Sequence, residues 1–182
     1  MTDERGGLRE RLVQVAMEML AEGASELSLR SVARAAGVSA MAPYRHFPDK
    51  AALLSAVADA GFVMLRASLE AADAEVSGRE ALVAQGLAYL AFARAHPALF
   101  RLMFSGVCET PEPGDAGGSA YAVLARRVER IVPAAHAAVA TTAAWAIVHG
   151  LAMLALDGRA AAGQQEAGAV LALFAHGLGG AD

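Results

Sequence analysis

Apolar residues recur at spacings of three and four along almost the whole chain, and no convincing run alternates apolar and polar positions. The first such segment, residues 8–21, places Leu12, Ala16 and Leu20 on one helical face, and Gly23 then ends the helix. The pattern therefore predicts an all-α fold of about nine helices. Beyond the first 47 residues, helices are expected from residue 48 to a break near 75–80, and then at about 81–95, 97–106, 120–131, 134–156 and 164–177.

Two short helices around a tight turn are predicted next to the first helix. Ser28 is a natural N-cap for residues 29–36, which carry an apolar stripe, and Gly37 ends that helix. A second serine caps the following helix, residues 39–47. The small side chain of Ala33 lets the two helices cross closely, and the glycine accepts the backbone of the turn. This is the spacing of a helix-turn-helix.

Residues 131–156 contain no Asp, Glu, Lys or Arg, which raises the question of a membrane span. A span needs about 20 apolar residues. This segment is mostly alanine, however, and contains a proline, two threonines and two histidines. We expect instead a helix that is buried on most sides, against its own core and a partner subunit, and no membrane contact.

The charge of the chain is unevenly distributed. The formal net charge is −4, yet residues 28–50 contain four basic residues, Arg30, Arg34, Arg45 and Lys50, against one acid. DNA binding needs a basic surface at the contact rather than a basic protein, because neutralised phosphates release counterions. An ordinary solvated face would mix acids among these bases. The local charge therefore favours DNA binding by the helix-turn-helix.

The composition argues against an exported protein and against an enzyme. Cys108 is the single cysteine and cannot form an internal disulfide, and the charged N-terminal segment lacks the apolar run of a signal peptide. The five histidines show no metal-ligand spacing, and no GxSxG or phosphate-loop pattern occurs. We therefore expect a cytoplasmic protein without catalytic residues, cofactor or metal.

The stretch VARAAGVSAMAPYRHFPDKAALL resembles the DNA-binding half of the tetracycline-repressor (TetR) family. The residues that fall in register are Ala33, Gly37, Val38, Ser39, Tyr44, His46, Phe47 and Lys50. The stretches AYLAFARAHPALFRLMFSG and WAIVHGLAML are similar to the C-terminal domain of a TetR subgroup named for its Trp, His and Gly, here Trp145, His149 and Gly150. Together the two matches cover most of the chain, in the right order.

The resemblance implies a helix-turn-helix DNA-binding domain at residues 1–50 and a ligand-binding and dimerisation domain at residues 51–182. In the first, it implies that Tyr44, His46 and Lys50 hold the DNA backbone, helped by Ser39 at the helix N-terminus. Arg30 is a further DNA-binding candidate because of its positive charge. The candidates for base contacts are Ala40, Met41, Ala42 and Arg45. The arginine suits a bidentate contact to guanine, and the apolar side chains suit thymine methyl groups. Phe47 is expected in the core.

Pro43 departs from the family pattern, in which this position is more often leucine. Proline lacks a backbone N–H and crowds the carbonyl four residues earlier, here that of Ser39. We expect it to distort the start of the second helix and to shift which of residues 40–42 face the groove.

The resemblance further implies a ligand-responsive regulator, most often a repressor, that binds a near-palindromic operator as a homodimer. The last two helices are apolar around much of their circumference, so they are expected to pack against their copy as a four-helix bundle. Such a dimer would hold two recognition helices about 34 to 36 Å apart, one turn of DNA. A small effector would bind better to a form with the wrong spacing, with the long fourth helix as the lever.

The pocket for a small, largely apolar effector is expected among the middle helices. Its candidate residues are Phe62, Leu65, Phe92, Phe100, Met103, Phe104, Trp145, His149 and Met153. Trp145 and His149 share a helix face, and one polar group beside an aromatic wall would orient such a ligand. In the alternative, the histidine is only hydrogen-bonded within the core.

A second reading of the whole chain is a ligand-binding or interaction protein with a weakened DNA-binding module. It is motivated by residues 40–42, whose side chains offer few hydrogen bonds to bases.

Overall fold

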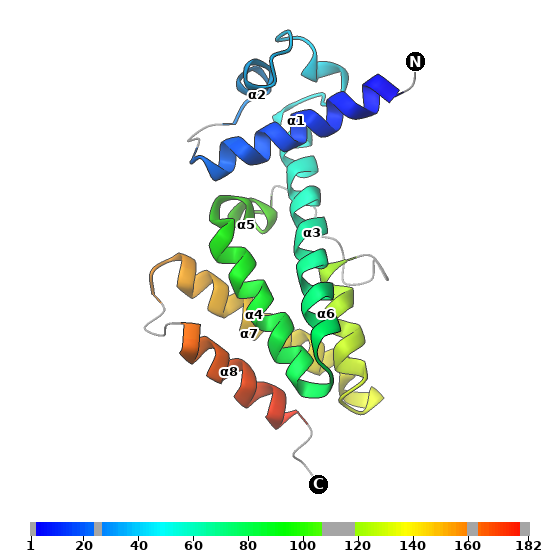
Figure 1. Cartoon of the computed structure of the whole chain (residues 1–182), viewed down its shortest axis with the longest axis vertical. Coiled ribbons are helices and arrows are strands. Elements are labelled where there is room, and N and C mark those ends of the chain that lie inside the picture. The colour runs from blue at the N-terminus through cyan, green and yellow to red at the C-terminus, as the bar shows by residue number, and fades with distance from the viewer. Residues whose placement is uncertain (1–2, 24–26, 107–118, 160–163, 179–182) are drawn as a thin grey trace. The chain divides into compact units, whose positions relative to one another are not determined.

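The computed structural model describes residues 3–23, 27–106, 119–159 and 164–178. These residues form eight α-helices and one 3₁₀ helix, with no strand among them (Figure 1). The helices are α1 (Asp3–Ala21), α2 (Leu29–Ala35), η1 (Pro43–Arg45), α3 (Lys50–Glu75), α4 (Gly78–Ala95), α5 (Pro97–Met103), α6 (Ala120–Glu129), α7 (Ala134–Leu156) and α8 (Gln164–Gly177). The all-α prediction is confirmed, and its later helix boundaries agree with the structure to within a few residues.

Contacts divide the chain into two compact units. The first unit comprises Met1–Phe62 and His96–Thr110, and the second comprises Val63–Ala95 and Pro111–Asp182. Helix α3 therefore contributes its first half to one unit and its second half to the other. The functional boundary predicted near residue 50 stays a prediction. Cys108 lies outside the described residues.

The first unit is built around α1, which packs against α2 and α5. Its fully buried side chains include Leu12 of α1, Val32 of α2 and Phe100 of α5. Where α3 passes α5, a Cβ at Gly61 would lie 2.7 Å from Sδ of Met103, so a larger residue here would force that side chain to shift. A segment from the middle of the chain thus completes the core beneath the predicted helix-turn-helix.

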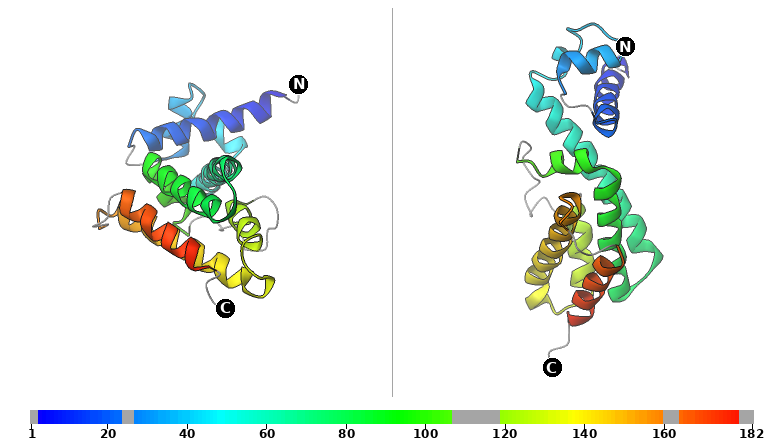
Figure 2. Two further views of the ribbon diagram at one scale, coloured as in Figure 1. Left: turned by 60° about the horizontal axis from the view of Figure 1, so that its bottom comes forward. Right: turned by 90° about the vertical axis from the view of Figure 1, so that its left-hand side faces the viewer.

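In the second unit α4 is the central helix, in contact with α6, α7 and α8. It runs antiparallel to α8, as Figure 2 shows: Nη2 of Arg79, at the start of α4, donates to the carbonyl of Leu178, just after α8, at 3.0 Å. Between these ends the two helices approach so closely that a Cβ at Gly86 would lie 2.8 Å from Cδ1 of Leu171. A side chain at residue 86 would therefore force Leu171 to shift.

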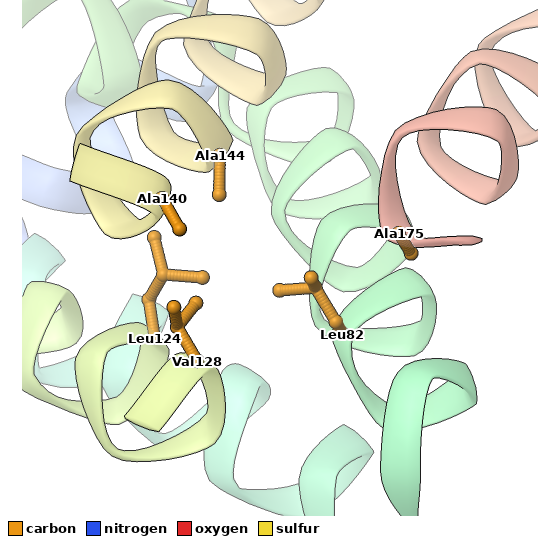
Figure 3. Packing of buried hydrophobic residues seen from close by; sticks show 6 residues of the cluster. All are labelled: Leu82, Leu124, Val128, Ala140, Ala144 and Ala175. Carbon is orange, nitrogen blue, oxygen red and sulfur yellow. The ribbon is translucent and has the colours of Figure 1, made fainter. Parts of the chain in front are cut away.

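Small side chains on α7 let α6 pack tightly. Figure 3 shows Leu124 and Val128 of α6 pointing toward Ala140 and Ala144 of α7, with Leu82 of α4 across from them. All five are buried. Burying a leucine or valine side chain of this kind contributes roughly 1.5 to 3 kcal/mol to the stability of the unit.

An ion pair ties α3 to α6 inside this unit. Arg127 donates from Nε and Nη2 to the two carboxylate oxygens of Asp73, at 2.7 and 2.8 Å, and Gln85 of α4 donates from Nε2 to the same carboxylate at 2.6 Å. The hydrogen bonds from Arg127 lower the pKa of Asp73 below its ordinary value, against the opposing effect of burial. The carboxylate therefore stays ionised and holds three helices together.

Two helices, α3 and α7, are long and apolar enough to cross a membrane by length and composition alone, which is weak evidence for a span. On α7 the buried residues Ala140, Thr141, Ala144, Val148 and Ala152 form one stripe at helical spacing. Val139 and Leu154 of the same helix are 74% and 47% exposed. Within the chain α7 is therefore covered on one face, and its other face is open.

Candidate nucleic-acid interface and effector site

The first helix of the predicted helix-turn-helix begins with a capping box. Oγ of Ser28 accepts from the backbone N–H of Ser31 at 3.0 Å, and Oγ of Ser31 accepts from that of Ser28 at 2.9 Å. These reciprocal bonds satisfy donors that the helix leaves open, which confirms Ser28 as the N-cap. Gly37 then turns the chain with φ +69°, a conformation that favours glycine.

The second helix differs from the prediction. Instead of an α-helix over residues 39–47, the structure has a turn followed by the three-residue 3₁₀ helix η1. The carbonyl of Ser39 accepts from the N–H of Ala42 at 2.9 Å, a bond of 3₁₀ type. Pro43 has no N–H with which to make the α-helical bond to Ser39, and this missing donor is the physical reason for the difference.

Pro43 is also part of the core, since it is among the fully buried side chains of the chain. Its carbonyl accepts from the N–H groups of His46 and Phe47, both at 2.9 Å, so regular bonding resumes after it. Phe47 is 1% exposed and packs beneath the guanidinium of Arg9, 5.3 Å from the ring centroid. The prediction that Phe47 belongs to the core is confirmed.

Most side chains predicted to contact DNA point outward. The exposed ones are Arg30, Ser39, Ala40, Met41, Tyr44, Arg45 and Lys50, and Ala42 and His46 are half-buried. Met41 is 69% and Tyr44 42% exposed, which is high for large apolar or aromatic side chains. Asp49 caps α3 by accepting from the N–H of Ala52 at 2.8 Å, and this cap fixes Lys50 at the first helical position. The surface thus combines positive charge with protruding apolar groups.

The nine residues predicted for the effector site fall into two groups, one in each unit. In the first unit Phe62 meets Phe104 edge to face at 5.5 Å between centroids, and Phe100 meets Phe104 at 4.9 Å. Phe100 and Met103 are completely buried. These two are therefore core residues of the first unit as the structure stands.

The second group contains Leu65, Phe92, Trp145, His149 and Met153. Leu65 and Phe92 are 1% and 5% exposed, so they are core residues. Trp145, His149 and Met153 are half-buried on α7 at intervals of four residues, and they share one face of that helix. These three residues are the partly accessible members of the second group.

A row of four aromatic rings crosses the second unit. Trp145 meets Tyr121 of α6 edge to face at 5.7 Å between centroids and His149 at 6.2 Å, and His149 meets Tyr89 of α4 at 6.4 Å. We call Tyr121, Trp145, His149 and Tyr89 the aromatic row. The spacing of Trp145 and His149 predicted half of it, but no pattern in the sequence indicated the two tyrosines, which come from other helices.

The histidine of the row is held by a hydrogen bond. Nδ1 of His149 lies 2.9 Å from the hydroxyl of Tyr89. Burial lowers the pKa of His149 and raises that of Tyr89, the latter opposed by a hydrogen-bonding contribution from Trp145. A neutral histidine carries one N–H, so the tautomer decides whether the tyrosine donates to Nδ1 or Nδ1–H donates to the phenol oxygen. The alternative of a histidine hydrogen-bonded within the fold is thus realised, and the ring remains half-buried.

Comparison with known proteins matches both halves of the chain. Residues 12–57 match the bacterial regulatory proteins of the tetR family, and residues 82–178 match the tetracyclin repressor-like C-terminal domain. The match of the second half does not extend to the Trp, His and Gly subgroup, so that assignment stays a prediction.

Solved structures with this fold include three that cover nearly the whole chain. A protein of unknown function from Rhodococcus sp. RHA1 is 34% identical, with a TM-score of 0.75, over 94% of this chain and 95% of its own. A TetR transcriptional regulator from Streptomyces coelicolor is 26% identical, with a TM-score of 0.63, over 96% of this chain and 88% of its own. TetR from Acinetobacter baumannii AYE shares the fold. It is 21% identical, with a TM-score of 0.68, over 91% of this chain and 93% of its own.

Among curated proteins, the nucleoid occlusion factor SlmA of Vibrio vulnificus is 36% identical over 106 residues, 55% of this chain and 53% of that protein. The chain spans about half the length of the curated relatives it matches. Both halves match regulatory families in the expected order, and the predicted helix-turn-helix, with α2 and η1, falls within the first match. The chain belongs to the TetR family of bacterial transcription regulators.

Proposed function

We propose that this protein is a ligand-responsive transcriptional regulator, acting as a repressor, that binds a near-palindromic operator as a homodimer. A small, largely apolar effector releases it from DNA by favouring a form whose DNA-binding units are wrongly spaced. The protein acts in the cytoplasm and has no catalytic step, in keeping with two family matches that are both to regulators.

The observation that carries the proposal is the exposed surface of the first unit. Arg30, Arg45 and Lys50 are exposed on it, and so is Met41. Cationic side chains around a short apolar element suit a duplex groove, where phosphates take the charge and base edges meet the protruding residue. Tyr44 and Ser39 add hydroxyl groups that suit phosphate oxygens.

Dimerisation through the last two helices is supported by their uncovered apolar residues. Val139 and Leu154 on α7 are exposed, and so are Val170 and Leu173 on α8, at 38% and 79%. Large apolar side chains gathered on two adjacent helices mark a protein interface. The two-fold axis of such a dimer would present two DNA-binding surfaces at about 34 to 36 Å, one turn of DNA.

A gel-shift assay on DNA flanking the gene, followed by selection from random DNA, tests the proposal. A salt-sensitive and sequence-selective complex with a two-fold symmetric site is expected. If sequence-selective binding never appears, the alternative of a ligand-binding or interaction protein with a weakened DNA-binding module replaces it.

The dimer has its own test. Leu173→Asp puts a charge on the most exposed apolar position of α8 and should produce monomers in light scattering, whereas Val63→Asp, at a 68% exposed apolar position of α3, should not. Monomeric wild-type protein at micromolar concentration would contradict this part of the proposal.

A further inference from the structure

The amide of Gln85 has only one possible orientation. Its Nε2 donates to Asp73 at 2.6 Å, and because a carboxylate can only accept, the nitrogen must face it. Oε1 therefore points away from the ion pair between Asp73 and Arg127. Gln85 is 2% exposed, and its Oε1 is buried without a hydrogen-bond partner.

A buried acceptor of this kind is costly. Its hydration is lost on folding and no protein group replaces it, so folded proteins retain few such atoms. One that is oriented by an ion pair is ready to receive a donor from outside the chain, either a water molecule or a ligand.

The aromatic row includes a residue one helical turn from Gln85. Tyr89 follows Gln85 by one helical turn, so the two residues are neighbours on one face of α4. Tyr89 in turn contacts His149, and His149 contacts Trp145. These last two rings are half-buried, so the row leads from the surface to the residue next to the acceptor.

The charges near Gln85 are balanced. Asp73 and Arg127 bind each other through two hydrogen bonds. Burial keeps the pKa of His149 low and that of Tyr89 high, so this pair is uncharged at neutral pH. An ionic ligand would gain little here and would lose its hydration.

We propose that Gln85 and the aromatic row form the effector subsite, and that the effector is a flat, uncharged aromatic compound with an N–H or O–H donor. The donor is bonded by Oε1 of Gln85, and the ring lies against Trp145 and His149. The inference rests on the proposed function, because it names the chemical class of the effector. Specificity comes from the donor, since an analogue without it leaves the acceptor buried and unpaired.

Titration calorimetry on the full-length protein with two matched probes tests this. Indole carries an N–H donor, and benzofuran has the same shape with an ether oxygen in its place. We expect indole to bind at least about tenfold more tightly, the equivalent of 1.4 kcal/mol. Equal affinities, or binding of neither probe at millimolar concentration, would overturn the proposal. Indole-3-carboxylate should bind more weakly than indole, and tighter binding would overturn the assignment of an uncharged ligand.

Gln85→Met tests whether the preference for indole over benzofuran depends on this residue. Methionine keeps the length of the side chain and removes the acceptor, so the ratio between indole and benzofuran should fall to about one. Gln14→Met, at an exposed glutamine of α1, should retain the wild-type ratio. Preference for indole that persists in folded Gln85→Met protein would overturn the assignment, and if that variant does not fold, the wild-type comparison still decides. Operator binding without ligand tests the proposed function separately.

Discussion

The hydroxyl of Tyr89 lies 2.9 Å from Nδ1 of His149 and joins α4 to α7 in the middle of the second unit. A protonated ring can only donate in this bond, whereas Nδ1 can accept or donate, depending on the tautomer, while the histidine is in its neutral state. Burial favours that state by lowering the pKa of His149 below its ordinary value of 6.5. The unit is thus sensitive to pH through one contact.

The free energy of unfolding should therefore decrease when the pH falls below 6.5. In the window between the lowered pKa of folded His149 and the ordinary value of 6.5, the unfolded chain binds the proton more readily than the folded one. The contribution of neutral His149 to the free energy of unfolding is complete above this window and is lost as the pH falls through it. Urea unfolding at pH 7.5 and pH 5.5 measures the difference.

In His149→Gln the loss between pH 7.5 and 5.5 should be smaller, because the glutamine amide does not titrate and can bond Tyr89 at both values. His136→Gln, at an exposed position of the same helix, should behave like the wild type. Identical pH dependence in wild type and His149→Gln would show that this contact is not the source.

Loss of the ion pair between Arg127 and Asp73 should lower the free energy of unfolding far more than loss of the contact between Arg126, the neighbouring residue on α6, and Glu70. Arg127 is 8% exposed and bonds both carboxylate oxygens, so Arg127→Met leaves a partly buried carboxylate uncompensated and should cost about 2 to 3 kcal/mol. Arg126 reaches Glu70 only at 3.6 Å, with both side chains more than 40% exposed, so Arg126→Met should cost about 0.5 kcal/mol or less. Urea unfolding of both variants gives the comparison, and equal losses would contradict it.

The contrast between these two arginines shows what a sequence can predict. Adjacent in the chain and identical in type, they differ only in what other helices bring to them, and Asp73 lies 54 positions away from Arg127. Helix boundaries were predictable because their signals are local: Ser28 as a cap, Gly37 as a turn and Pro97 as a break. The partners Tyr89 and Gln85 were not, because long-range packing sets them.

The structure around Pro43 was only partly predictable from the sequence. The missing N–H of this proline is a local signal, and the expected distortion is confirmed, but the burial of its side chain in the first unit had no local signal. Pro43→Leu restores the donor and should extend regular helix across residues 39–47. Carbon chemical shifts of residues 39–45 would then move toward α-helical values, and unchanged shifts would contradict the explanation. Pro48→Leu, at an exposed position, should leave them as they are.

Lys50 and Arg45 should separate phosphate binding from base reading on the selected operator. Lys50 is exposed at the start of α3, and Lys50→Gln should weaken binding to all sequences alike, because a phosphate contact does not depend on the base sequence. The slope of log K against log salt should also decrease in magnitude by about 1 for the lost phosphate contact. Arg45→Gln should instead lose about 1 to 3 kcal/mol for the preferred base pair and relax selectivity at that position.

Gel shifts at several salt concentrations, repeated on single-base variants of the operator, measure both effects. Arg66→Gln removes the same charge from a residue of the second unit that pairs with Glu70, and it should alter neither quantity. If Lys50→Gln and Arg66→Gln changed the salt dependence equally, only the net charge of the protein would matter. If only Lys50→Gln lowers the salt dependence of binding, the side chain of Lys50 must face the DNA. We expect this result because Lys50, like Tyr44 and Arg45, is exposed on a protein that is acidic overall.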